Sequence, residues 1–204
     1  MSEVSAALVR DLRDKTGAGM LDCKKALVES SGDLEKAIVF LREKGLAAAQ
    51  KKSARVASQG MVGSYIHAGG KIGVLIEVNC ETDFVARTPE FQELVKDLAM
   101  QVAAANPRYV QRVQIPAETV EAERNIYRAQ AAGSGKPANV VEKIVDGKVE
   151  KFFADVCLLE QPFIKEPQRT VGQLVTDAVG RIGENIVVRR FARFQLGDAT
   201  EASA

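Results

Sequence analysis

The chain has 204 residues, of which 46% are hydrophobic and 27% are charged, so it has the composition of a soluble globular protein. Its net charge of +1 argues against a dedicated nucleic-acid binder, since such proteins carry a clear basic excess. No apolar run approaches the ~20 residues of a membrane helix, and the polar residues from Ser2 onward do not form a secretory signal. We therefore expect a cytoplasmic protein with no membrane partner and no direct nucleic-acid partner.

The first 55 residues predict a small helical module followed by a linker. Val4, Leu8 and Leu12 recur every four residues over 4–16, and Gly17 is a natural helix end. A second helix is expected over 21–30. A third is expected from Asp33, which is suited to cap it, to Gly45, and a further short helix over 46–52. We expect this module and its linker to form one domain over residues 1–55.

In the remainder, residues 56–204, the spacing of apolar residues changes from that of helices to include the alternation of strands. This predicts a second domain that contains both helices and strands. Alternating apolar residues predict strands over 61–67 and 71–79 with a hairpin turn between them, and a third strand over 185–194. Pro89, after Thr88, begins a helix that ends near Asn106, and Thr170 is suited to cap a helix through Ile182.

A helical hairpin is predicted as an insertion at about residues 117–160. Helices are expected over 117–132, 138–144 and 148–159, and they flank a sharp glycine–proline turn at 133–137. With the three strands, this gives an α+β fold in which helices pack a three-stranded antiparallel sheet.

The sequence predicts no catalytic centre. Cys23, Cys80 and Cys157 are odd in number and far apart, so they form no disulfide framework, and together with His67, the single histidine, they give no metal-ligand spacing. The run at 133–137 lacks the first glycine and the final Ser or Thr of a phosphate-binding loop. We expect neither cofactor nor metal. A competing hypothesis is an enzyme that uses Cys80 as a nucleophile.

The segment Val78–Val85 places an acid and a large aromatic residue between a predicted strand and a predicted helix. Two interpretations are open. Thr82 or Asp83 caps the helix and Phe84 belongs to the core, or Asp83 and Phe84 reach another molecule. The same choice applies to Met20 and Leu21, which follow the glycine loop at 17–19.

Two longer motifs carry a resemblance to a known family. The runs Leu8–Met20 and Cys80–Ala86 closely resemble bacterial elongation factor Ts, and shorter matches follow in order, including Gln161–Phe163, Thr170–Leu174 and Ile182–Ile186. The resemblance implies an N-terminal three-helix module similar to the ubiquitin-associated fold, followed by the elongation factor Ts core.

The resemblance also implies a function. The family acts as guanine nucleotide exchange factors for elongation factor Tu, without covalent chemistry. It implies that Thr82, Asp83, Phe84 and Val85 disturb the magnesium and phosphate region of that GTPase. It further implies that Leu12, Met20 and Leu21 dock the helical module on it. The alternative is a non-catalytic protein-interaction module.

One departure from the family's longer members predicts an oligomer. Those members carry two sheet subdomains and a C-terminal helical module, whereas this sequence has one predicted hairpin and one late strand. A homodimer would then supply from two chains what a long chain has alone.

Overall fold

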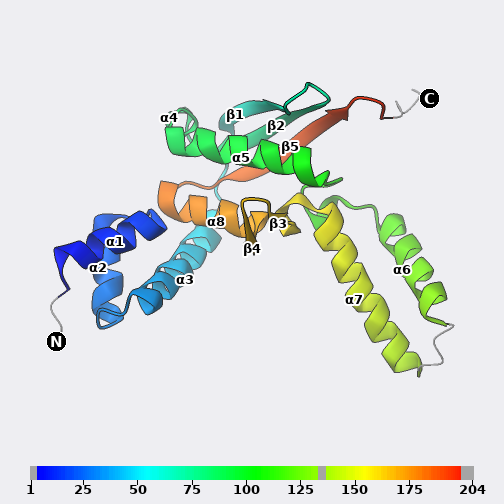
Figure 1. Cartoon of the computed structure of the whole chain (residues 1–204), viewed down its shortest axis with the longest axis horizontal. Helices are drawn as coiled ribbons and strands as arrows, with labels where there is room; N and C mark the ends of the chain where they lie inside the picture. The colour runs from blue at the N-terminus through cyan, green and yellow to red at the C-terminus, as the bar shows by residue number, and fades with distance from the viewer. Residues whose placement is uncertain (1–3, 133–136, 199–204) are drawn as a thin grey trace. The chain divides into compact units, whose positions relative to one another are not determined.

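A computed structural model describes residues 4–132 and 137–198 (Figure 1). Its helices and strands, in chain order, are α1 Ala6–Thr16, α2 Met20–Glu29, α3 Leu34–Lys52, β1 Gln59–Ile66, β2 Ile72–Cys80, α4 Asp83–Ala86, α5 Pro89–Ala105, the 3₁₀ turn η1 Arg112–Gln114, α6 Ala117–Ala132, α7 Ala138–Val156, the 3₁₀ turn η2 Leu158–Glu160, β3 Pro162–Phe163, β4 Glu166–Thr170, α8 Val171–Ile182 and β5 Val187–Gln195. The α+β fold expected from the sequence is confirmed.

The chain forms two compact units, and each is built from separate stretches of sequence. The first comprises Met1–Met61, Val78–Leu94 and Val175–Val187, and the second comprises Val62–Glu77, Val95–Leu174 and Val188–Ala204. The first unit therefore combines the N-terminal helices with α4 and most of α8. The second holds most of the sheet and the helical hairpin.

The three N-terminal helices of the first unit begin close to their predicted starts, and Asp33 caps α3 as expected, whereas the cap of α1, Ser5, was not predicted. The Ser5 hydroxyl accepts a hydrogen bond from the Leu8 amide at 3.2 Å, and the Asp33 carboxylate accepts one from the Lys36 amide at 3.0 Å. Gly17 ends α1 in the left-handed conformation, as expected. The helices enclose a small aliphatic core of Val9, Leu12, Cys23, Ala26, Leu27 and Ala37.

Helix α3 is longer than the sequence predicted, because it continues through Gly45 to Lys52 without a break. The expected helix end at Gly45 was wrong. A glycine inside a helix costs only about 1 kcal/mol relative to alanine, and the alanines and lysines that follow favour the helix. The close approach of the two helices concerns Gly180 of α8 instead, where a Cβ atom would lie 3.3 Å from the Gly45 Cα atom, whereas a Cβ atom on Gly45 would meet no other atom within 4 Å.

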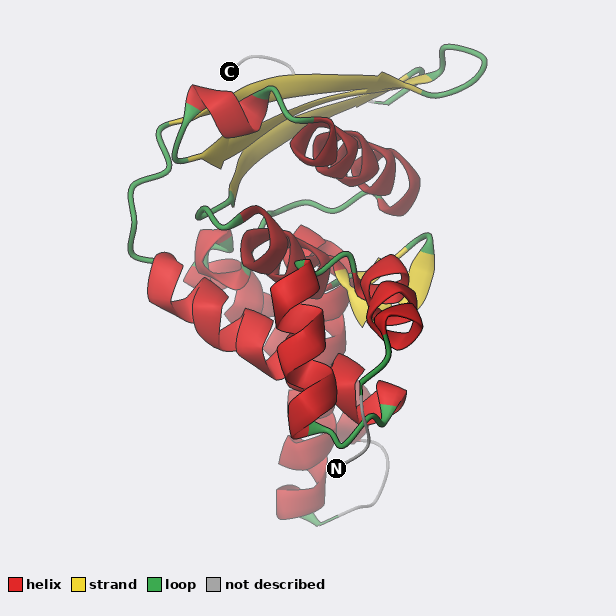
Figure 2. Ribbon diagram, turned by 90° about the vertical axis from the view of Figure 1, so that its left-hand side faces the viewer, coloured by secondary structure: helices red, strands yellow, loops and turns green. Residues whose placement is uncertain are grey.

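The three-stranded sheet has the order β1-β2-β5 and is antiparallel, as predicted. Figure 2 shows α5 lying along one face of it. On that face, a Cβ atom on Gly63 would lie 2.4 Å from a methyl carbon of Val95, so only glycine lets the helix approach β1 this closely. Val74 and Ile76 of β2 are buried on either side of the exposed Leu75, which gives the expected alternation.

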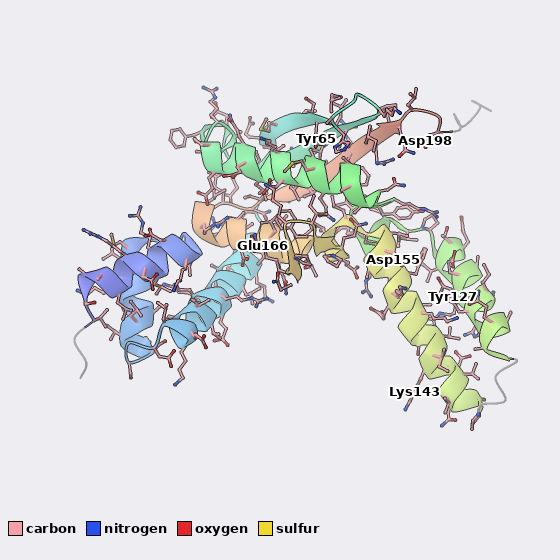
Figure 3. The ribbon with its side chains drawn as sticks, viewed as in Figure 1. Tyr65, Tyr127, Lys143, Asp155, Glu166 and Asp198 are labelled. Carbon is pink, nitrogen blue, oxygen red and sulfur yellow. The ribbon has the colours of Figure 1, made fainter. Side chains whose placement is uncertain are left out.

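Helices α6 and α7 of the second unit form the predicted antiparallel hairpin (Figure 1). Arg124 and Arg128 of α6 pair with Asp146 and Glu142 of α7, so a later position on one helix meets an earlier position on the other. Figure 3 labels Tyr127 on α6 and Lys143 and Asp155 on α7. The base of the hairpin encloses a second core of Ile115, Phe152, Val156 and Cys157.

Two details of this region differ from the expectation. Helix α7 runs unbroken through Gly147, where the sequence suggested an interruption. The short antiparallel pair β3 and β4 was not predicted, since β3 has two residues and the five residues of β4 show no apolar alternation. Of the turn at 133–137, residues 133–136 lie outside the described residues. No helix among the described residues is long and apolar enough to cross a membrane.

Candidate protein-binding site

Helix α4 presents the central motif at the end of β2. Thr82 lies in an extended conformation before the helix, and its hydroxyl accepts a hydrogen bond from the Val85 amide at 3.3 Å. Asp83 occupies the first turn, where a carboxylate is favoured by the positive end of the helix dipole. The predicted strand–turn–helix is thus confirmed, and Thr82 is its cap.

The side chains that follow the cap divide between surface and core. Phe84 is 77% exposed, so its interpretation as a core residue was wrong. Asp83 is also exposed and pairs with Arg87 one turn later at 2.8 Å. Val85, by contrast, is buried, and it supports the turn from inside instead of facing a partner. The motif therefore offers an acid and a large aromatic side chain to solvent.

The N-terminal module offers a second apolar surface at the start of α2. Met20 is 46% exposed and Leu21 is 83% exposed, so neither is the core residue that one interpretation expected. Leu12 is 0% exposed and lies in the core of the module. Its expected role as a docking contact is incompatible with this burial, because a side chain without accessible surface touches no partner.

All seven residues that the sequence singled out fall within the first unit. The exposed members are Thr82, Asp83 and Phe84 at α4, and Met20 and Leu21 at α2. Aromatic residues and methionine are enriched at protein–protein interfaces relative to the rest of the surface, and Phe84 and Met20 are of these types. The arrangement suits recognition of another protein.

Glu184, which was not among the predicted site residues, binds the backbone and the hydroxyl at the start of α4. The Glu184 carboxylate accepts hydrogen bonds from the backbone amides of Glu81 and Thr82, both at 3.0 Å, and from the Thr82 hydroxyl at 2.7 Å. More than 100 residues separate these partners in the chain, so no spacing rule could pair them. The run Ile182–Ile186 was the only sequence signal.

The described residues give little support to the competing nucleophile hypothesis. The three cysteines are free and buried. Burial raises the pKa of the Cys80 thiol, and the negative charge of Glu184 raises it further. His67 is exposed and shares a hydrogen bond with the Tyr65 hydroxyl. Among the described residues, no cluster of three or more histidine, cysteine or acidic side chains could hold a metal ion.

We expect the cysteines of the folded chain to resist alkylation at pH 8. Burial raises the pKa of the Cys157 thiol to about 11, and the thiolate is the reactive form. As pH rises above about 8.5, the Cys157 thiol ionises in the unfolded chain but stays neutral in the folded chain. Ionisation therefore favours the unfolded state, and the free energy of unfolding falls between that pH and about 11. Mass spectrometry after iodoacetamide treatment, with urea-unfolded protein as the control, checks this. Rapid modification of Cys80 in the folded chain would contradict it.

Comparison with known proteins agrees with this geometry. A family model described as "Elongation factor TS" matches residues 14–198. The chain belongs to the elongation factor Ts family. It is 60% identical over 195 residues to elongation factor Ts of Heliobacterium modesticaldum, covering 96% of this chain and 91% of that protein. Elongation factor Ts of Koribacter versatilis is 61% identical over 201 residues, covering 98% and 92% of the two chains.

Family membership makes the chain an elongation factor of protein biosynthesis. Elongation factor Ts of Geobacter sulfurreducens is likewise 60% identical, over 97% of this chain and 92% of that protein. These relatives are therefore of nearly the same length as this chain. The resemblance inferred from the two motifs is confirmed.

Proposed function

We propose that this protein is a cytoplasmic guanine nucleotide exchange factor for elongation factor Tu. The observation that carries the proposal is the exposed Asp83–Phe84 pair at the start of α4 in a chain of this family. The factor binds the GDP complex, disturbs its magnesium and phosphate site, and holds the nucleotide-free state until GTP binds. It makes and breaks no covalent bond, so it needs no nucleophile and no cofactor.

The physical requirement for exchange is differential binding. A factor accelerates GDP release only if it binds the nucleotide-free GTPase more tightly than the GDP-bound one. This coupling is reciprocal, so GTP that rebinds displaces the factor. An aromatic side chain that enters between elements of the GTPase, and a carboxylate next to its phosphate and metal ligands, meet this requirement. Both favour the state from which GDP and Mg²⁺ have left.

Docking and exchange are assigned to different parts of the first unit. Met20 and Leu21 of the helical module, residues 1–55, anchor the factor on the nucleotide-binding domain. Asp83 and Phe84 act on the nucleotide site. The charged hairpin of α6 and α7 adds contact area.

Release of a fluorescent GDP analogue from elongation factor Tu tests the proposal. With the protein at substoichiometric concentration, we expect many GDP molecules to be released for each molecule of factor. Binding without acceleration would leave the alternative, a non-catalytic interaction module of the same fold. A factor that neither binds nor accelerates would overturn both.

We also propose that two chains associate through the open face of the sheet. Arg193 of β5 donates hydrogen bonds to the Ala103 carbonyl of α5, so alternation turns its neighbour Phe194 to the opposite face. Leu75 of β2 lies on that face as well, beside the ion pair of Glu77 with Arg190. The exposed apolar side chains of this face are Val62, Ile66, Leu75 and Phe194.

Sedimentation equilibrium at micromolar concentration is expected to give the mass of two chains. Leu75→Glu places a charge in the middle of the open face, and it is expected to give the mass of one chain without loss of folding, because Leu75 is exposed. A single-chain mass for the unmodified protein would contradict the homodimer.

A further inference from the structure

Three segments of the first unit that are far apart in the chain are joined by hydrogen bonds next to the Thr82–Phe84 turn. They are the segment 53–55 that follows α3, the end of β2 at 81–82, and the loop 184–185 that follows α8. We call this set the clasp. Its hydrogen bonds hold the start of the four-residue helix α4 in place.

Glu184 binds the turn from one side. One carboxylate oxygen accepts the amide hydrogens of Glu81 and Thr82, and the other accepts the Thr82 hydroxyl hydrogen. Hydrogen bonds to an ionised carboxylate are roughly twice as strong as neutral ones. The Thr82 hydroxyl thus donates to Glu184 and accepts from the Val85 amide, so its rotation is fixed and the cap of α4 with it.

Glu81 in turn binds the loop that carries Glu184. Its carboxylate accepts the backbone amide of Asn185 at 2.7 Å and lies 3.5 Å from the Arg55 guanidinium. The Asn185 side chain is buried and donates to the carbonyls of Ser53 and Arg55, at 3.4 and 2.8 Å. Glu184 therefore binds the backbone of Glu81, and Glu81 binds the backbone of Asn185, the next residue after Glu184. The side-chain amide of Asn185 joins this loop to the segment that follows α3.

The buried side chains of Val85 and Ala86 fix the inner half of α4, and the clasp contacts fix its first residues, which carry Asp83 and Phe84. Helix α4 has four residues, too few to be stable alone. Phe84 is exposed and gives it little packing. Removing Glu184 would leave the amides of Glu81 and Thr82 without their carboxylate partner.

We infer that Glu184 and Asn185 are positioning residues, which hold Asp83 and Phe84 in the geometry that acts on the partner and connect that geometry to the docking module. This inference rests on the proposed exchange function. A group that is held in its bound conformation before association loses less entropy when it binds. A loosened turn still reaches the partner, but it enters the nucleotide site less often in the productive orientation.

The test compares Glu184→Ala with Glu184→Gln in the stimulated GDP release assay. For Glu184→Ala we expect the maximal release rate at saturating factor to fall about tenfold, the equivalent of one charge-assisted hydrogen bond. The half-saturating concentration should change much less, since docking through α2 remains. Glu184→Gln keeps an amide oxygen for the two backbone amides and should recover most of the rate.

The matched control is Glu90→Ala. It removes an ion pair with Arg181 in the same unit, at 3.1 Å, without touching the clasp, and it should leave the rate unchanged. Combining Glu184→Ala with Phe84→Ala provides the decisive comparison. If Glu184 acts through Phe84, the double variant is no slower than Phe84→Ala alone, whereas independent effects multiply.

Three outcomes are distinguishable. Stimulation by the unmodified protein, together with an unchanged maximal rate for Glu184→Ala, overturns the positioning role alone. No stimulation by the unmodified protein overturns the exchange function, and the inference with it. If Glu184→Ala is unfolded at the assay temperature, Thr82→Val removes the hydroxyl that donates to Glu184 and accepts from the Val85 amide, and the same fall in maximal rate is expected. An unchanged maximal rate in Thr82→Val would overturn the positioning role.

Discussion

Phe84→Ala should reduce the maximal rate of stimulated GDP release by roughly 30-fold or more, the effect of losing a central aromatic anchor. The free energy of unfolding should change by no more than about 0.5 kcal/mol, because the side chain is 77% exposed. Affinity for the GDP-bound GTPase should fall less than the rate, since Met20 and Leu21 still dock. Stopped-flow release of a fluorescent GDP analogue at several factor concentrations separates the two effects.

The control for Phe84→Ala is Val113→Ala, which shortens another exposed apolar side chain outside the proposed site. It should leave both rate and affinity unchanged. Equal losses of affinity and rate in Phe84→Ala would contradict the proposed action on the nucleotide site, because they would make Phe84 an anchor only. A large fall in the melting temperature would contradict its place on the surface.

Leu12→Ala and Met20→Ala should have opposite consequences, although the resemblance assigned both residues to docking. Leu12 is fully buried, so its truncation leaves a cavity and should lower the free energy of unfolding by about 2–5 kcal/mol. Met20 is 46% exposed, so Met20→Ala should leave stability nearly unchanged and weaken docking. Denaturant unfolding followed by circular dichroism and titration with elongation factor Tu measure the two quantities.

A stable Leu12→Ala variant with weakened docking would show that Leu12 reaches the partner after all. Unfolding of the module in Met20→Ala would show the reverse, that Met20 belongs to the core. The pair is matched because both changes remove an unbranched or γ-branched apolar side chain from the same three-helix module.

The elements that follow local rules could be predicted from the sequence. Ser5, Asp33 and Thr88 cap α1, α3 and α5 through hydrogen bonds to amides three residues later. The alternation of β2 gave its buried face. Gly45 was misread as a helix end, because a single glycine inside a helix costs only about 1 kcal/mol and the residues after it favour the helix.

The site was predicted in part. The strand–turn–helix around Thr82 was expected, but whether Phe84 faced the core or solvent was left open, because a four-residue helix has no measurable period. Leu12 was expected on the docking surface because the resemblance assigns a role to the motif as a whole. It does not say which face of the helix is buried, and Leu12 lies on the buried face. Glu184 was missed because it binds backbone amides about 100 residues away, and backbone amides carry no sequence signature.

The exposure of Phe84 has a practical consequence in a chain that contains no tryptophan. A tryptophan in its place would be the only indole of this protein and would keep a large aromatic ring at the start of α4. Indole emission shifts to shorter wavelength when water leaves its surroundings. The same side chain that is proposed to enter the GTPase would then act as an optical reporter of that entry, on the time scale of a single exchange event.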